Sequence, residues 1–392
     1  MRLDEIVITH ALRTPIGRFL GVYEDLSAVE LGVSLLQNLV AKAGVDRALI
    51  DQVILGSARQ AGLGPNPARQ VACGAGMRDE ALAMTVNQAC GSGLRSIILG
   101  AQELLLGEAE VVVAGGIESM SRVPFLLPGF RSGYGQGDAE VVDAMYRDGF
   151  HCPMADKVMG ATVEQLAAQE DVDRAAQDTY AALSQNRCEA ARREGRFREE
   201  LAPVMVGDRL VEDDEHPRDG VSAESLGKLP AVFHHDGSIT AGNSSGITDG
   251  AALVLMMSDQ RANELDLPIL GRFRAHATAG LEPARMGLGP VPAITALLRR
   301  EPELQSVDGY DLVEINEAFA AQVIACERAL GLDRDRLNVN GGAIALGHPI
   351  GATGARIVVT LLHELQRRGG DHGLASLCVS GGFGVAASFT RT

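Results

Sequence analysis

The sequence predicts an α/β protein made of two duplicated halves with a long excursion between them. Three observations support this class: an internal repeat, an alternation of buried-strand runs with amphipathic helices, and a break in that alternation over residues 119–248. A chain of 392 residues is also too long for most single hydrophobic cores, so more than one domain is expected.

The internal repeat is clearest in one helix of each half. A shift of 261 positions places Gly93 on Gly354 and Arg95 on Arg356. In the first copy, apolar residues recur at helical spacing, at Leu94, Ile97, Ile98, Ala101, Leu104 and Leu105. Glycine follows each helix, as a left-handed C-terminal cap requires, and a buried-strand run comes next, at 111–116 and at 374–379. So many matches in register indicate duplicated halves.

The other elements follow the same plan in both halves. The first half is expected to contain a strand at 5–10, a helix at 28–43 and a strand at 52–56; the second, a strand at 269–277, a helix at 291–300 and a strand at 312–315. The excursion holds a Gly-rich run, a helical piece at 162–194 and an acidic run at 212–215. We therefore predict a first half at 1–118 plus 249–268, an inserted loop domain at 119–248, and a second half at 269–392.

Composition excludes several function classes. A net charge of −16 argues against nucleic acid as a partner. The longest apolar run, Ala251 to Met257, is too short to span a bilayer, and residues 1–5 lack the pattern of a signal peptide. The six cysteines are dispersed without a C-x-x-C pair, so neither a metal site nor a disulfide framework is expected. These features favour a cytoplasmic location.

Cys90 is the first candidate for chemistry. It lies in N-Q-A-C-G-S-G (87–93), at the turn that precedes the first repeated helix. An isolated cysteine here is either a small apolar residue filling a corner or a nucleophile. The positive end of the helix dipole and its free N–H groups favour the thiolate, which predicts a lowered pKa for this thiol.

The second half supplies partners for Cys90. His348, in G-H-P-I-G-A-T-G (347–354), occupies the matching helix entrance, so a pseudo-twofold arrangement brings it toward Cys90 as a base. Cys378 ends the last strand run, and Asn316 directly follows a strand, where sites of α/β sheets collect. The glycine-rich run 341–347 fits neither a P-loop nor a dinucleotide-binding fingerprint.

Taken together, these residues resemble the thiolase family. The motifs that carry the resemblance are R-T-P-I-G (13–17), N-Q-A-C-G-S-G (87–93), G-G-I-E-S-M-S (115–121), G-N-S-S-G-I-T-D-G-A-A (242–252), N-E-A-F-A (316–320), G-G-A-I-A-L-G-H-P-I-G-A-T-G-A-R (341–356) and C-V-S-G-G-F-G (378–384). They occur in the family's order and span essentially the whole chain.

The resemblance implies a duplicated αβαβα fold of five layers, whose inserted loop domain covers coenzyme A. It implies ping-pong acyl transfer, in which Cys90 is acylated with His348 as its base and Cys378 exchanges a proton with the substrate Cα. His348 and a water held by Asn316 would form one oxyanion hole. The backbone N–H groups of Cys90 and Ser380 would form the other.

The resemblance also implies binding residues. Coenzyme A contacts are expected at Arg218, Ser225 and Ser245, and the substrate pocket at Val158, Met159, Ala318 and Phe319. Two positions depart from the family pattern. Val158 stands where short-chain biosynthetic members usually have histidine, and Ser380 replaces a usual glycine.

The favoured function is that of an acetyl-CoA C-acetyltransferase, with a 3-ketoacyl-CoA thiolase of fatty-acid β-oxidation as the alternative. A condensing enzyme of the ketoacyl-synthase type is disfavoured by Cys378, and a non-catalytic acyl-CoA- or lipid-binding relative by the presence of Cys90, His348 and Cys378 together. No cofactor is expected beyond coenzyme A thioesters as substrates. The expected assembly is a homodimer or homotetramer.

Overall fold

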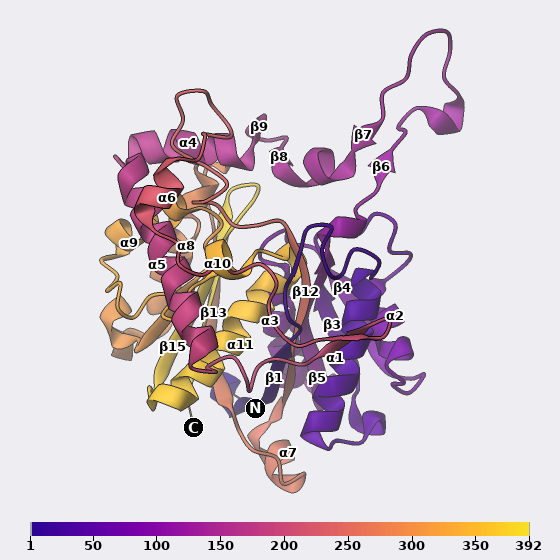
Figure 1. Cartoon of the computed structure of the whole chain (residues 1–392). Coiled ribbons are helices and arrows are strands. Elements are labelled where there is room, and N and C mark those ends of the chain that lie inside the picture. Colours follow the sequence, from indigo (N-terminus) through magenta and orange to yellow (C-terminus); the bar gives the residue numbers. More distant parts are fainter. Residues whose placement is uncertain (1, 392) are drawn as a thin grey trace.

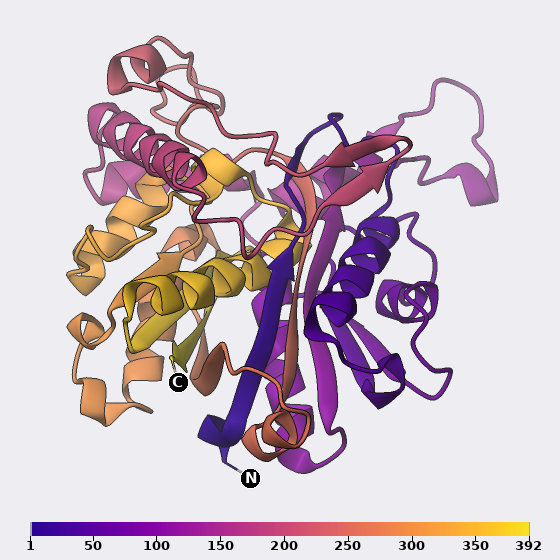
Figure 2. The same cartoon turned by 60° about the horizontal axis from the view of Figure 1, so that its bottom comes forward.

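The computed structural model describes residues 2–391 as alternating layers of helix and sheet (Figures 1 and 2). Two helices, α1 (Ala28–Ala43) and α2 (Pro67–Gly74), cover one outer face. Helices α3 (Ser92–Leu106) and α11 (Ile350–Arg368) fill the central layer, and α8 (Pro290–Leu298) and α9 (Ala320–Leu330) cover the other outer face. The predicted αβαβα arrangement is confirmed.

A separate apolar core fills each helix–sheet boundary. Ile97 of α3 and Val358 of α11 belong to the central core, Leu35 of α1 to the core of the first half, and Ile294 of α8 to the core of the second half. All four side chains are inaccessible to solvent. Apolar burial on both faces of each sheet layer explains why their strand runs are almost continuously hydrophobic.

The sheet layers are joined into one mixed sheet. The first half contributes β1 (Ile6–Arg13), β3 (Gln52–Gly56), β4 (Leu82–Val86), β5 (Val111–Ser119) and β12 (Thr248–Ser258). The second half contributes β13 (Gly271–Gly280), β14 (Leu312–Ile315), β15 (His372–Val379) and β16 (Phe383–Thr390). The short β2 (Gly17–Arg18) pairs with β12, and a brief pairing of β1 with β13 links the halves.

Strand order shows the duplication directly. In the first half β3 runs parallel to β5, β12 pairs antiparallel with β5, and β1 pairs antiparallel with β12. In the second half β14, β15, β16 and β13 repeat this order and these orientations. Two strands of the first half have no counterpart in the second half within residues 2–391: β4, paired with β3 at the outer edge, and the short β2, paired with β12. The repeat seen in the sequence therefore corresponds to two copies of one sheet topology.

Several boundaries differ from expectation. The helical piece expected at 162–194 is two helices, α4 (Met159–Gln169) and α5 (Arg174–Arg193). Asp171 between them has a left-handed backbone (φ +51°), and the Asp173 side chain caps α5 by accepting the N–H of Ala176 at 2.7 Å. The Asp173 cap thus begins a second helix at a point where apolar periodicity alone predicted one continuous helix.

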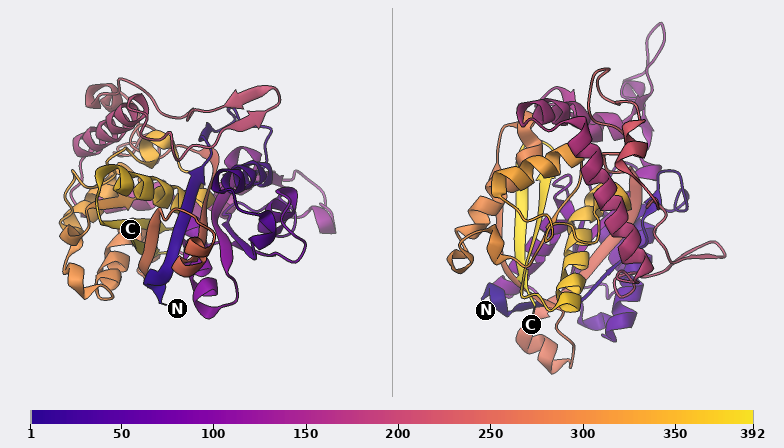
Figure 3. Two further views of the ribbon diagram at one scale, coloured as in Figure 1. Left: turned by 90° about the horizontal axis from the view of Figure 1, so that it is seen from below. Right: turned by 60° about the vertical axis from the view of Figure 1, so that its left-hand side comes forward.

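The excursion between β5 and β12 carries small elements that cover one end of the sheet. They are β6 (Phe125–Leu126), β7 (Val142–Asp143), β8 (His151–Cys152), β9 (Lys157–Val158), α4, α5, β10 (Val204–Val206), β11 (Arg209–Val211) and α6 (Ala223–Gly227). The arm at 127–141 projects away from the body in Figures 1 and 3. The remaining short helices are α7 (Asp259–Glu264) and α10 (Ala343–Leu346).

A buried ion-pair network ties the excursion to the first half. The guanidinium of Arg13, at the end of β1, donates to Glu200 at 2.6 Å and to both carboxylate oxygens of Asp214 at 2.6 and 2.9 Å. Asp214 belongs to the acidic run at 212–215, yet it is only 6 % exposed. Removing one partner would leave a buried uncompensated charge, so the network holds this part of the excursion against the end of β1.

No helix within residues 2–391 is long and apolar enough to cross a membrane.

The first turns of α3 and α11 meet at the centre of the molecule. A Cβ atom added to Gly354 would lie 2.3 Å from the backbone nitrogen of Leu94, and one added to Gly93 would lie 2.7 Å from that of Ala355. No side chain fits at either position without moving backbone. The two helix entrances, and the residues just before them, are therefore held against each other.

Replacing Gly354 with alanine should destabilise the protein, although alanine is the better helix former. We expect a loss of about 1–3 kcal/mol, typical of overpacking in a closed core, measured as a lower midpoint of urea unfolding. The control is Gly227→Ala in α6, whose added Cβ would meet only Asp178 Oδ2, at 3.9 Å. Equal stability of the two variants would contradict the close contact of α3 with α11.

Candidate active site

A cavity of about 400 Å³ opens where both halves meet the excursion. The predicted site residues on its wall are Cys90, Val158, Met159, Arg218, Ser245, Ala318, Phe319, His348, Cys378 and Ser380. They come from segments far apart in the sequence, and only the folded chain brings them together. Two predicted residues lie off this wall, Asn316 and Ser225.

Cys90 lies in the turn between β4 and α3, two residues before the helix begins. The preceding Ala89 has a left-handed backbone (φ +45°), a conformation that costs a non-glycine residue about 1–3 kcal/mol. Two backbone N–H groups, those of Ser380 and of Cys90 itself, point at the sulfur. The backbone of Ser380 does not have a positive φ, so serine can replace the glycine that is usual at this position without backbone strain.

The lowered pKa expected for Cys90 is wrong. Burial raises the pKa of this thiol, and the Arg59 guanidinium and the two backbone N–H groups offset that effect only in part. The helix-dipole argument identified one favourable contribution, but loss of water around the sulfur outweighs it. Cys90 therefore rests as a thiol and needs a base when it reacts.

His348 lies on the same cavity wall, and its hydrogen bonds define its tautomer. Nδ1 lies 2.6 Å from Oγ1 of Thr353, while the Thr353 hydroxyl donates to the carbonyl of Pro349 at 2.9 Å. Since a hydroxyl has a single proton, Nδ1 carries the ring proton and donates it to Thr353. Nε2 is then the basic nitrogen of the ring.

Burial and nearby cations keep His348 neutral. Its side chain is nearly enclosed, at 6 % exposed, and desolvation, with the charges of Arg356 and Arg59, lowers its pKa to about 3. The backbone also holds it, because the N–H of His348 donates to the carbonyl of Gly246 at 3.0 Å. A neutral imidazole with an unprotonated Nε2 can accept a proton at any pH above this value.

Asn316 lies behind His348 and does not line the cavity. Its Nδ2 donates to His348 Nε2 across 3.4 Å, and its Oδ1 is buried with no partner. A buried amide oxygen without a donor is costly, which suits a water molecule at this position. The structure thus places the amide next to the histidine, as the resemblance implied.

Cys378, the last residue but one of β15, also lines the cavity and is 1 % exposed. Burial raises its pKa well above that of an ordinary thiol, and the nearby Cys90 raises it further. It therefore holds its proton at rest. Cys90, Cys378 and His348 are therefore all uncharged at rest.

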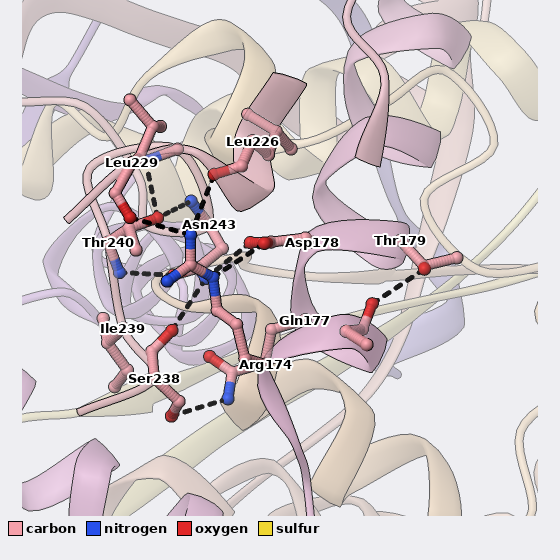
Figure 4. A network of polar contacts seen from close by, with 12 residues as sticks. Arg174, Gln177, Asp178, Thr179, Leu226, Leu229, Ser238, Ile239, Thr240 and Asn243 are labelled. Carbon is pink, nitrogen blue, oxygen red and sulfur yellow. Dashed lines mark hydrogen bonds and ion pairs between the residues drawn. The ribbon is translucent and has the colours of Figure 1, made fainter. Parts of the chain in front are cut away.

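The loop that carries Ser245 is fixed by a polar network from α5 (Figure 4). Asn243 Nδ2 donates to Asp178 at 2.9 Å and to the Ser238 carbonyl at 3.0 Å, and its Oδ1 accepts the N–H of Thr240 at 2.8 Å. Arg174 completes the network by pairing with Asp178 at 2.7 Å. Asp178 and Asn243 are buried, so the loop presents Ser245 to the cavity from a rigid base.

Ser225 lies away from the cavity. It is on the short exposed helix α6, where its hydroxyl donates to the Ser222 carbonyl at 2.7 Å. Arg218 is on the cavity wall, and its backbone N–H donates to Gln185 Oε1 at 3.1 Å. This hydrogen bond does not involve the guanidinium of Arg218.

Among the polar residues of the cavity wall that sequence reasoning missed are two basic ones, Arg59 and His216. His216 Nδ1 lies 2.8 Å from the carbonyl of Ala345, and burial lowers its pKa, so this ring is also neutral. Both residues stand in loops without periodicity or motif. The only available signal was their type, a histidine and an arginine in otherwise apolar or acidic surroundings.

Comparison with known families gives two matches that cover nearly the whole chain. Residues 6–260 match the thiolase N-terminal domain, and residues 267–391 match the thiolase C-terminal domain.

Individual proteins agree with the family match. The chain is 48 % identical to an acetyl-CoA acetyltransferase of Pseudomonas aeruginosa and 47 % identical to a probable acetyl-CoA acetyltransferase of Escherichia coli, over 99 % of this chain and 100 % of each relative. The crystal structure of the Bacillus anthracis acetyl-CoA acetyltransferase superimposes with a TM-score of 0.96 at 42 % identity, covering 100 % of this chain and 99 % of that one. Human mitochondrial 3-ketoacyl-CoA thiolase gives 0.95 at 39 % identity, covering 99 % and 98 %.

The raised pKa of Cys90 predicts how this thiol reacts with iodoacetamide. Alkylation should accelerate as the pH rises and should pass its midpoint above the value of an ordinary cysteine, about 8.5. Peptide mapping separates Cys90 from Cys73, the exposed cysteine, which serves as the internal control. A rate that reaches its plateau near neutral pH would show a preformed thiolate and contradict the dominance of burial.

Proposed function

The chain belongs to the thiolase family, and we propose that it acts as an acetyl-CoA C-acetyltransferase, which joins two acetyl-CoA molecules into acetoacetyl-CoA and releases coenzyme A. One observation carries the proposal: two cysteines and a neutral histidine line the same cavity. Carbon–carbon bond formation between thioesters needs a group that holds the acyl chain and a separate group that exchanges the Cα proton. A single cysteine cannot serve both needs at once.

In the first half-reaction the Cys90 sulfur attacks the acetyl-CoA carbonyl while its proton moves to His348 Nε2. The bond from the carbonyl carbon to the coenzyme A sulfur breaks, and His348 returns the proton to the leaving thiolate. The N–H groups of Ser380 and Cys90 already face the Cys90 sulfur, which supports their role as donors to the oxyanion that forms beside it.

In the second half-reaction the Cys378 thiol gives its proton to His348 Nε2, and the resulting thiolate takes a proton from Cα of a second acetyl-CoA. The resulting enolate attacks the acetyl group on Cys90, a carbon–carbon bond forms, and the bond to the Cys90 sulfur breaks. His348, which now carries a proton on Nε2, and a water on Asn316 would donate to the enolate oxygen, and Nε2 passes its proton to the Cys90 sulfur as that sulfur leaves. In the reverse direction, thiolysis, the raised pKa of Cys378 favours its role as the proton donor to Cα.

Binding of coenzyme A is assigned to Arg218, Ser225 and Ser245. The guanidinium of Arg218 suits a phosphate or the adenine ring on an otherwise acidic protein. Ser245 is the better supported serine, because the network under its loop holds it at the cavity wall. No further cofactor is required, since the thioester substrates and the side chains supply every group in these steps.

A 3-ketoacyl-CoA thiolase that acts on longer chains is the second candidate. Val158, on the cavity wall, is apolar where short-chain biosynthetic members usually have histidine, and Met159 and Phe319 extend the apolar surface. An apolar wall of this kind suits a longer acyl chain as well as it suits an acetyl group.

We also propose a homodimer or homotetramer in the cytoplasm. Strand β4 is an open sheet edge, and Leu82 on it is 64 % exposed. The projecting arm exposes Phe125 and Phe130, at 66 % and 67 %. Unpaired strand edges and exposed aromatic side chains are typical of subunit contacts.

Acetyl-CoA alone should leave one acetyl group on Cys90, because the first half-reaction needs no second substrate. Intact mass spectrometry followed by peptide mapping measures the adduct. Cys90→Ser should abolish the thioester, whereas Cys378→Ala should retain it. An adduct on another residue, or none at all, would contradict the assignment of Cys90.

Chain length separates the two candidate functions. With an acetyltransferase, kcat/KM for thiolysis should be highest for acetoacetyl-CoA and fall along the series of 3-ketohexanoyl-, 3-ketooctanoyl- and 3-ketodecanoyl-CoA. The contact of one methylene group changes kcat/KM by about 10-fold, so the trend along the series is measurable. A rise along the same series would favour the β-oxidation enzyme.

Thr353→Val should lower kcat by about 10- to 100-fold with little change in KM, because Nδ1 of His348 loses its acceptor and the tautomer with basic Nε2 is no longer favoured. Valine has nearly the shape of threonine, so packing in α11 is retained. Thr353→Ser keeps the hydroxyl and should keep most of the activity. Equal rates for the Val and Ser variants would show that the hydroxyl does not position the base.

A further inference from the structure

Arg59 is a buried cation on the cavity wall that the steps above do not use. It lies in the loop after β3 and is 8 % exposed. Its Nε is buried without a hydrogen-bond partner, and its one side-chain hydrogen bond is long, 3.4 Å from Nη1 to the carbonyl of Ala58. Within residues 2–391 no carboxylate pairs with this guanidinium. A buried charge without a counterion is costly, so a binding partner for it is expected.

The two acidic residues near Arg59 are engaged elsewhere. The Glu118 carboxylate accepts the backbone N–H groups of Ala58, Arg59 and Gly351, at 3.1, 3.1 and 2.8 Å. Asp148 is paired with Arg147 through two hydrogen bonds, at 2.8 and 3.1 Å. The Arg59 charge acts to lower the pKa of both carboxyl groups, but within residues 2–391 neither carboxylate forms a direct ion pair with the Arg59 guanidinium.

The surroundings hold the guanidinium in place. It lies 5.8 Å from the centre of the Phe150 ring, and a Cβ atom added to Gly149 would fall 2.5 Å from its Cζ, Nε and Nη2. The absence of a side chain at Gly149 is thus what makes room for Arg59 beside the cavity. Its charge also acts on both reacting groups, since it lowers the pKa of Cys90 and that of His348. Arg59 therefore lies close to where an acyl group on Cys90 would be.

We propose that Arg59 is a subsite for acyl chains that end in a carboxylate, so that this enzyme accepts 3-ketoacyl-CoA thioesters of dicarboxylic acids. The inference rests on the proposed function and extends its substrate class. A planar guanidinium pairs with a carboxylate through two parallel hydrogen bonds, which a methyl terminus cannot accept. The phosphates of coenzyme A have a separate cation, Arg218, on the excursion.

The reaction needs no reagent beyond coenzyme A. Cys90 attacks the 3-keto carbon, its proton passes to His348, and the bond between carbons 2 and 3 breaks. The acetyl-CoA enolate takes a proton from Cys378 and leaves as acetyl-CoA. The carboxyacyl group remains on Cys90 as a thioester, with its terminal carboxylate on Arg59. Coenzyme A then attacks this thioester, the bond to the Cys90 sulfur breaks and the carboxyacyl group leaves as its coenzyme A thioester, while the coenzyme A thiol proton and the proton on His348 restore the thiols of Cys378 and Cys90.

The test compares thiolysis of 3-ketoadipyl-CoA with that of 3-ketoheptanoyl-CoA, which has a similar length and no charge. The measured quantity is the ratio of the two kcat/KM values in the full-length protein. The wild type should favour the charged substrate. Arg59→Met should lower the ratio by about 10- to 100-fold, the loss expected when a carboxylate loses its charged partner. Arg59→Lys should restore part of it.

Arg218→Met is the matched control, because it removes the other cation of the same wall while both substrates carry the same coenzyme A. It should leave the ratio unchanged, whatever it does to the individual rates. An Arg59→Met variant that lowers both kcat/KM values equally would assign Arg59 to the chemistry of Cys90 and overturn the subsite. Wild type that cleaves acetoacetyl-CoA but disfavours 3-ketoadipyl-CoA would overturn it as well. Failure with acetoacetyl-CoA and with every other 3-ketoacyl-CoA would instead overturn the proposed function.

Discussion

Two helices meet end to end at the centre of the molecule, and their first turns approach so closely that only glycine backbone fits between them. Gly93 of α3 and Gly354 of α11 form this contact. Cys90 and His348 each lie two residues before the helix of their own half, so the contact brings both to one cavity. Glu118 strengthens the same junction, because its carboxylate binds N–H groups from both halves. The site is therefore a consequence of how the duplicated halves pack.

Loss of water is the main electrostatic influence inside that cavity. It raises the pKa of Cys90 and of Cys378 and lowers that of His348, so all three groups are neutral at rest. A neutral site avoids the cost of buried charge until a thioester enters, and the proton then moves directly between adjacent groups. Arg59 is the exception, a buried cation on the same cavity wall as Cys90 that has no directly hydrogen-bonded carboxylate within residues 2–391.

Much of this arrangement was predictable from sequence, and the remainder has physical reasons. The repeat at 261 positions predicted the duplicated fold, because strand order and helix packing are copied with it. The resemblance predicted ten of the residues on the cavity wall, including Cys90, His348 and Cys378. The break between α4 and α5 depends on a single aspartate cap, which apolar periodicity does not detect. The pKa direction of Cys90 and the place of Arg59 depend on tertiary burial, which local sequence does not encode.

The most direct test of this account is a crystal structure of the protein after reaction with acetyl-CoA. We predict an acetyl group on the Cys90 sulfur, with its carbonyl oxygen accepting the N–H groups of Cys90 and Ser380. His348 Nε2 and Cys378 Sγ should both face the acetyl carbon from the far side of the cavity. An acetyl group on Cys378, or one on Cys90 whose oxygen points away from these two N–H groups, would contradict the account.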